Sequence, residues 1–169
     1  GTQIDTMLFE GVKQEFVTAE NINAIFAKYE IPYEFGLLSI DIDGNDYWIW
    51  KALVSHYKPE FVVIEYNATL GCEDSKVIPY DPNYSWDGTD WFGASLKALA
   101  YLGKGKGYEL AYCDKAGVNA FFVKQVEDKS LSDSELDEWV RMVYQPIGYI
   151  PHRHREGPWY EIEGKVGGK

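Results

Sequence analysis

The chain has 169 residues, a mass of 19.3 kDa, a formal net charge of −11 and a pI near 4.7. Its composition is 46% hydrophobic and 16% aromatic, which excludes an intrinsically disordered chain. The acidic balance excludes a general nucleic-acid binder, because phosphate backbones require a basic surface. We therefore expect one folded domain over residues 1–169.

Cellular location follows from what the sequence lacks. Cys72 and Cys113 stand alone, without the spacing of a metal or redox motif. The sequence contains no signal-peptide pattern and no apolar run long enough to span a bilayer. We expect a cytoplasmic protein that has no membrane partner.

The first 67 residues predict alternating strands and helices. In chain order these are a strand at 13–17, a helix at 19–29 capped by Thr18, a strand at 37–42, a helix capped by Asn45 or Asp46 that ends before Pro59, and a strand at 61–65. The apolar run at 37–42 lies between two glycines and predicts a strand buried on both faces. Two strands joined by a helix predict a parallel pair.

The second half begins with a loop at 68–92 that is rich in aromatic residues, a length typical of a binding loop or lid. The elements predicted after it are a helix at 94–102 that stops at Gly103, a hairpin of strands at 108–113 and 118–124, and a helix at 132–144 capped by Ser132. The tail after Pro146 is expected to be irregular. The predicted fold is α/β and Rossmann-like, with a mostly parallel sheet flanked by helices and an antiparallel hairpin at one edge.

Acidic side chains follow the two predicted parallel strands. Asp41 and Asp43 follow the first, and Glu65 ends the second. Ligands bind at the carboxyl ends of such strands in open α/β sheets. Neighbouring carboxylates raise one another's pKa, so either aspartate is a candidate general base. Alternatively, Asp41, Asp43 and Glu65 are oxygen ligands suited to Mg²⁺.

Several interpretations of the segment from Asp41 to Asp46 compete. The pattern D-x-D-G resembles the nucleophile motif of haloacid-dehalogenase-type phosphatases, and D-x-D resembles the metal motif of many glycosyltransferases. A third interpretation makes Asn45 and Asp46 simple turn and cap residues. A fourth makes the chain a non-catalytic ligand-binding or oligomerisation module.

A longer resemblance covers residues 35–125. The succession L-L-S-I-D-I-D-G-N-D-Y-W, F-V-V-I-E-Y-N, F-G-A-S-L-K-A-L and N-A-F-F-V resembles the C-terminal half of class I S-adenosylmethionine-dependent methyltransferases, most closely the FkbM type. Residues 126–169 would add a C-terminal helix and tail. The resemblance implies methyl transfer to a small-molecule or sugar hydroxyl.

The resemblance also implies roles for individual residues. Asp41 and Asp43 would face the reacting groups as catalytic residues. The acceptor would contact residues at both strand ends and in the aromatic loop, namely Asn45, Asp46, Glu65, Asn67, Trp86 and Trp91. The donor would contact Thr18, Glu20 and Asp41.

The chain departs from the family where the donor should bind. No Gly-x-Gly loop occurs before Lys13, so donor binding by this chain alone is in doubt. The family's first strand lies beside the strand that corresponds to 37–42, and its loss would expose an apolar edge. We expect residues 13–17, or a second copy of the chain, to cover that edge, and the second case predicts a homodimer.

Overall fold

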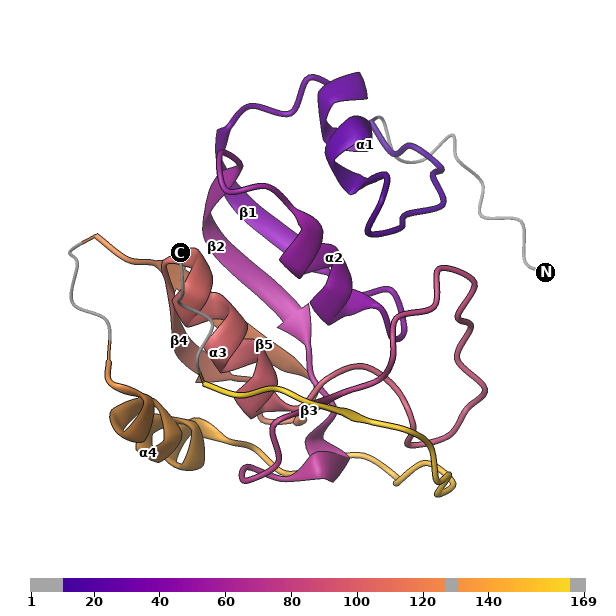
Figure 1. The fold of residues 1–169 in the computed structure, drawn as a ribbon, viewed down its shortest axis with the longest axis vertical. Coiled ribbons are helices and arrows are strands. Elements are labelled where there is room, and N and C mark those ends of the chain that lie inside the picture. Colours follow the sequence, from indigo (N-terminus) through magenta and orange to yellow (C-terminus); the bar gives the residue numbers. More distant parts are fainter. Residues whose placement is uncertain (1–10, 127–130, 165–169) are drawn as a thin grey trace.

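The computed structural model describes residues 11–126 and 131–164 and is an α/β structure (Figure 1). The helices are α1 (Ile22–Lys28), α2 (Asp46–Ala52), α3 (Leu96–Lys106) and α4 (Asp133–Val143). The strands are β1 (Glu34–Ile40), β2 (Lys58–Glu65), β3 (Lys76–Val77), β4 (Tyr108–Cys113), β5 (Asn119–Lys124) and β6 (Tyr160–Glu161). A single 3₁₀ turn at Ala68–Leu70 follows β2.

The main sheet has four strands in the order β1-β2-β5-β4. β1 and β2 are parallel, with Leu37 opposite Phe61, whereas β5 is antiparallel to both β2 and β4. The predicted hairpin therefore forms one side of the sheet. The prediction of a mostly parallel sheet is wrong, because the hairpin supplies half of the strands and inserts β5 directly beside β2.

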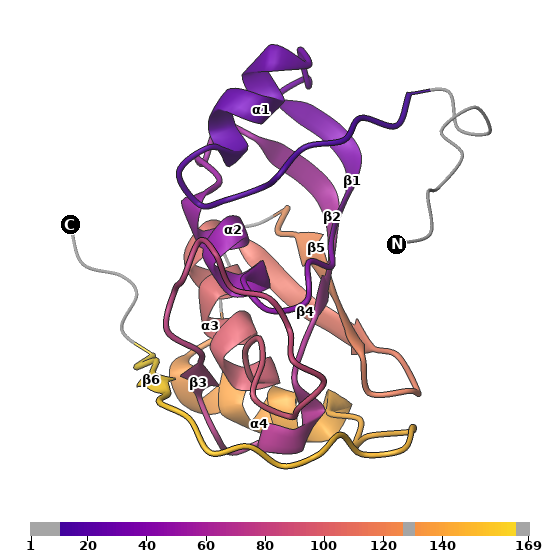
Figure 2. The same cartoon turned by 90° about the vertical axis from the view of Figure 1, so that its right-hand side faces the viewer.

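The helices lie on one side of this sheet (Figure 2). The core includes Trp50 of α2, Leu99 of α3 and Phe122 of β5, all nearly inaccessible to solvent. α3 continues past its predicted end because Gly103 packs against this core: a Cβ there would lie 2.8 Å from Cδ1 of Phe122. The helix ends at Gly107, which has a left-handed backbone conformation.

The opposite face of the sheet is not covered in the part of the chain that the structure describes. Leu37, Phe61 and Tyr112 remain 57%, 48% and 49% exposed. The prediction that β1 is buried on both faces is therefore wrong. An apolar run places apolar side chains on both faces of a strand. It does not specify whether a second layer of the protein covers both faces.

The segment before β1 also differs from the prediction. Residues 13–17 form no strand and do not pair with β1. Asn21 accepts a hydrogen bond from the Thr18 N–H at 2.8 Å and donates one to the Phe16 carbonyl at 2.8 Å. These bonds bend the chain into a turn, and α1 begins at Ile22 with Asn21, not Thr18, at the N-cap position.

The C-terminal segment is more ordered than predicted. α4 forms as expected, with Ser132 and Glu135 in a reciprocal capping box. After α4 the chain passes beside the aromatic loop, and β6 pairs antiparallel with β3. Figure 1 shows this last segment (yellow) next to β3. Residues 68–92 and the tail, which are distant in sequence, therefore form one layer at the same end of the molecule.

Candidate functional site

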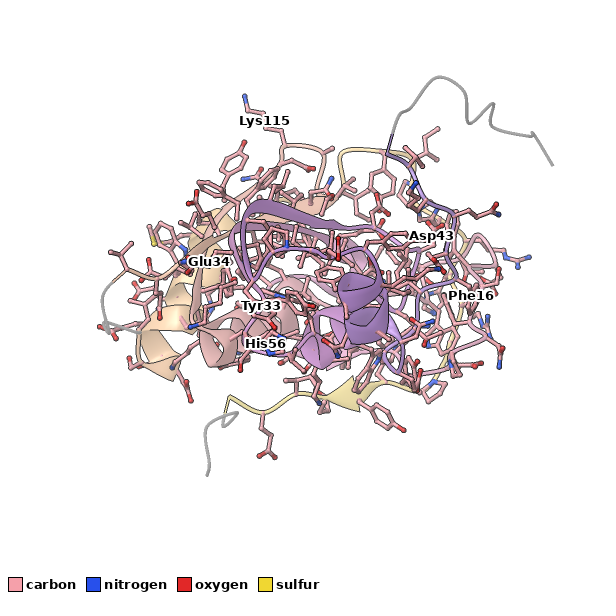
Figure 3. The ribbon with its side chains drawn as sticks, turned by 90° about the horizontal axis from the view of Figure 1, so that it is seen from above. Phe16, Tyr33, Glu34, Asp43, His56 and Lys115 are labelled. Carbon is pink, nitrogen blue, oxygen red and sulfur yellow. The ribbon has the colours of Figure 1, made fainter. Side chains whose placement is uncertain are left out.

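The candidate site lies at the carboxyl ends of β1 and β2. Because the two strands are parallel neighbours, the turn after β1 and the last residue of β2, Glu65, lie at the same edge of the sheet. Asp43 follows β1 and adopts a left-handed backbone conformation with φ of 58°. In Figure 3 Asp43 lies to the right of Tyr33, Glu34 and His56, because β1 begins at Glu34 and ends before Asp43. The predicted convergence of Asp43 and Glu65 is thus present.

Asp46 holds the turn between β1 and α2 in shape. It is 1% exposed, and its carboxylate accepts hydrogen bonds from the Ile42 N–H at 3.0 Å and the Gly44 N–H at 2.9 Å. Burial raises the pKa of Asp46, and these two N–H donors oppose that rise. The buried carboxylate is therefore a structural part of the turn.

Asn45 connects the same turn to the aromatic loop. Its amide Nδ2 donates to the Asp81 carbonyl at 2.8 Å, and the side chain makes no cap bond to α2. Its Oδ1 atom is buried and has no hydrogen-bond partner among the described residues. The interpretation of Asn45 as a side-chain cap is therefore wrong, whereas the turn-forming role of Asp46 is supported.

Glu65 is a second carboxyl group at this site whose pKa is raised. Burial, followed by the charges of Asp46, Asp41 and Asp43, raises the pKa of Glu65 to about 8. None of these four carboxylates forms a salt bridge within residues 11–126 and 131–164. The site therefore concentrates negative charge without a neighbouring cation to neutralise it.

A cavity of about 140 Å³ opens at this point and is lined by Asp43, Glu65, Trp86, Phe92 and His152. The Trp86 and His152 rings have centroids 4.8 Å apart and are inclined at 78°. Phe92 lies 6.2 Å from Trp86 and 6.1 Å from His152, at 69° and 81°. Three nearly perpendicular rings thus form a corner that faces two carboxyl groups.

Asn67 fixes the loop that carries these rings. It is fully buried, and its Nδ2 donates to the carbonyls of Asp90 at 2.8 Å and Phe92 at 2.9 Å, while its Oδ1 accepts from the Thr69 N–H at 3.0 Å. Asn67, predicted to contact the acceptor, does not line the cavity, and its amide is bound to the loop backbone. Asn67 instead supports the wall of the cavity.

The C-terminal segment also binds the aromatic loop and holds it in place. The Asp90 carboxylate accepts from the Arg155 N–H at 2.7 Å and contacts Nδ1 of His154 at 2.8 Å, which raises the pKa of that histidine. Arg155 also pairs with Asp87 and stacks on the Trp91 ring at 4.4 Å. Loop and tail together complete the cavity.

Some predicted residues lie away from the cavity. Trp86 lines it, but Trp91 stacks on Arg155 instead, and its indole N–H donates to the Pro158 carbonyl at 3.2 Å. Asp41 is exposed, does not line the cavity and acts on Glu65 only through its charge. Thr18 and Glu20 precede α1, where Glu20 accepts a hydrogen bond from Tyr80.

Sequence reasoning missed Phe92 and His152. Phe92 belongs to the aromatic loop, but nothing local distinguishes it from the other rings there. His152 comes from the tail, 87 positions after Glu65, and reaches the cavity through pairing of the tail with the loop. Only covariation between related sequences, or the tertiary structure itself, would reveal that residues so far apart in the sequence line one cavity.

The residues of the site do not form a metal centre. In the two ranges that the structure describes, no three His, Cys, Asp or Glu side chains are grouped so as to hold a metal ion. Asp41, Asp43 and Glu65, the residues predicted as ligands of Mg²⁺, are accordingly not grouped as a ligand set in this structure. No described helix is long and apolar enough to cross a membrane.

A larger cavity, of about 360 Å³, is unrelated to these groups. It lies between β4 and α4, with Leu110, Leu136 and Trp139 in its lining. Its surface is largely apolar, and none of the predicted site residues contributes to it. The cavity at the ends of β1 and β2 is the better functional candidate, since it combines aromatic walls with Glu65, a carboxyl group of raised pKa.

Comparison of the chain with protein-family models, with curated proteins and with solved structures found no match. The function therefore has to be argued from the site itself.

S-adenosylmethionine does not fit the described residues. The cavity of about 140 Å³ is smaller than the ~300–1,000 Å³ typical of pockets that enclose drug-sized ligands. No glycine-rich loop precedes β1, and Thr18 and Glu20 are engaged in the turn and with Tyr80. The site has room for a small group, not for a nucleoside.

Proposed function

We propose that this chain is a methyltransferase-like domain whose cavity, at the ends of β1 and β2, binds a small-molecule acceptor. The observation that carries the proposal is Glu65, a carboxyl group with a pKa of about 8 that lines an aromatic cavity. A carboxyl with this pKa exchanges a proton with a bound molecule near neutral pH. Binding and proton exchange are the parts of the function that these residues can perform.

Two features support the relation to methyltransferases. The acidic strand end, the second strand ending in Glu65 and the covering aromatic loop follow one another in the order that the resemblance implies. The hairpin also occupies the side of the sheet that the resemblance implies. The phosphatase and glycosyltransferase alternatives both need Asp41 at the reacting centre, whereas Asp41 does not line the cavity.

Ligand screening by NMR tests the proposal. The Trp86 indole N–H donates to the Thr89 carbonyl at 2.8 Å and provides a distinct signal at the cavity wall. We expect small polar ligands to shift this signal together with the amides of Glu65 and Phe92. Ligands that shift only signals around Trp139, in the cavity between β4 and α4, would contradict the proposal.

Calorimetric titration of the full chain with S-adenosylmethionine tests the donor part. We expect no saturable binding, because the cavity at the ends of β1 and β2, of about 140 Å³, is too small to enclose this donor. Saturable binding would show a complete donor site in this chain and replace the proposal with that of a self-sufficient methyltransferase.

A further inference from the structure

Three aromatic rings form walls of the cavity. Trp86, Phe92 and His152 are mutually inclined at 69° to 81°, so they enclose a corner instead of stacking. The Tyr149 ring packs against His152, with the two ring centroids 5.3 Å apart. Ring faces carry partial negative charge and attract cations that come within about 6 Å.

The opposite side of the cavity is acidic. Asp43 and Glu65 line it, and the charges of Asp41 and Asp46 act on Glu65 from the β1–α2 turn. Arg155, a cation of the adjoining tail, does not line the cavity and is bound to Asp87 and to the Trp91 ring. The raised pKa of Glu65 means that ionising this carboxyl group at the cavity is costly, and a bound cation would relieve that cost.

The kind of cation follows from the geometry. Among the described residues the oxygen and nitrogen ligands are not grouped as a metal would require. Three aromatic walls instead suit a cation with an apolar exterior, such as an alkylated ammonium group. The cavity volume of about 140 Å³ limits the enclosed part to a head group.

Resting on the proposed small-molecule site, we propose that this cavity binds the alkylated ammonium head group of an organic cation. The rings of Trp86, Phe92 and His152 surround the alkyl groups, and the Asp43 carboxylate balances the charge, joined by Glu65 when the bound cation displaces its proton. The rest of the ligand lies outside the cavity mouth, beside the exposed edge of Trp86, which is 38% exposed.

A matched pair of ligands tests this proposal on the full chain. Choline carries a trimethylammonium group, and 3,3-dimethylbutan-1-ol has the same shape without the charge. In titrations followed by tryptophan fluorescence, we expect choline to bind about tenfold more tightly than the alcohol.

Substitutions of residues that line the cavity test whether choline binds there. We expect Trp86→Leu and Asp43→Asn each to weaken choline binding about tenfold, and asparagine tolerates the left-handed conformation of residue 43. Tyr112→Leu, which removes an exposed ring on the far face of the sheet, serves as the matched control and should leave binding unchanged. Circular dichroism melts verify that each variant is folded.

The outcomes separate the two proposals. Equal or tighter binding of the neutral alcohol, lost in Trp86→Leu, would overturn the cation proposal and leave the small-molecule site intact. Failure of both ligands to bind, together with no hits in the NMR screen, would overturn both. Choline binding unchanged by Trp86→Leu and Asp43→Asn would place the cation elsewhere and also overturn this inference.

Discussion

Gly44 lies directly beneath the ring of Tyr84: a Cβ atom on Gly44 would lie 2.6 Å from Cδ1 of that ring and overlap its neighbour Cε1. This contact joins the β1–α2 turn to the aromatic loop. The hydroxyl of Tyr84 then donates to the Trp91 carbonyl at 2.8 Å. One glycine therefore sets how closely the loop approaches the acidic turn.

Gly44→Ala is expected to destabilise the fold by about 1–3 kcal/mol, because the methyl group meets the Tyr84 ring and the φ of +150° suits only glycine. Urea unfolding measures the effect. Gly36→Ala in β1 is the control, since a Cβ there meets nothing within 4 Å. Equal unfolding midpoints for the two variants would contradict the close contact.

The raised pKa of Glu65 makes stability depend on pH. Its pKa is about 8 in the folded protein and 4.5 as a free side chain, so the folded state retains a proton that the unfolded state loses between these values. The stabilisation is complete below about pH 4.5 and is lost as the pH rises through about 8. We expect the free energy of unfolding to fall by up to ~1.4 kcal/mol per pH unit in this window.

Glu65→Gln should flatten that dependence, because the amide does not ionise. The groups that face Glu65 are common to both proteins: Asp41, Asp43 and Asp46 from the β1–α2 turn, Tyr84 from the loop, and Tyr149 and His152 from the tail. Asp46, whose pKa is also raised, adds a slope of the same sign to both. Parallel curves of unfolding free energy from pH 5 to 8 would show that Glu65 titrates normally.

Asn67→Asp is expected to loosen the cavity wall. The new carboxylate would face the Asp90 and Phe92 carbonyls without a donor, which costs about 3 kcal/mol of stability. Hydrogen exchange should accelerate over residues 81–92 more than in the sheet. Asn83→Asp, an exposed change on the same loop, should have little effect. Uniform acceleration across the chain would instead indicate global destabilisation.

No described strand pairs with the outer edge of β1, and this edge predicts self-association. Residues 13–17 do not pair with it, so the remaining expectation is pairing with a second copy of the chain. We expect light scattering to give twice the 19.3 kDa chain mass. Leu37→Lys, at a 57% exposed position of β1, should yield monomers, whereas Met142→Lys on α4 should not. A monomeric wild-type protein would overturn the prediction.

The elements that the sequence predicted correctly have strong local signals. α4 begins at the capping box of Ser132 and Glu135, and the β4–β5 hairpin follows from two apolar runs around a turn at Asp114. The predictions were wrong where contacts between residues distant in the sequence determine the local structure. α3 passes through Gly103 because Phe122 requires a small residue there, and the tail forms β6 because β3 lies beside it.

The sequence by itself determined the acidic turn from Asp41 to Asp46 at a strand end, because apolar runs and turn residues act over short distances. Only the tertiary structure decided which groups form a site. It placed the half-buried Glu65 close to the charges of three other carboxylates, and it brought Phe92 and His152 to the same cavity. A pKa shift and a cavity both depend on burial and on contacts between distant segments, which no local pattern encodes.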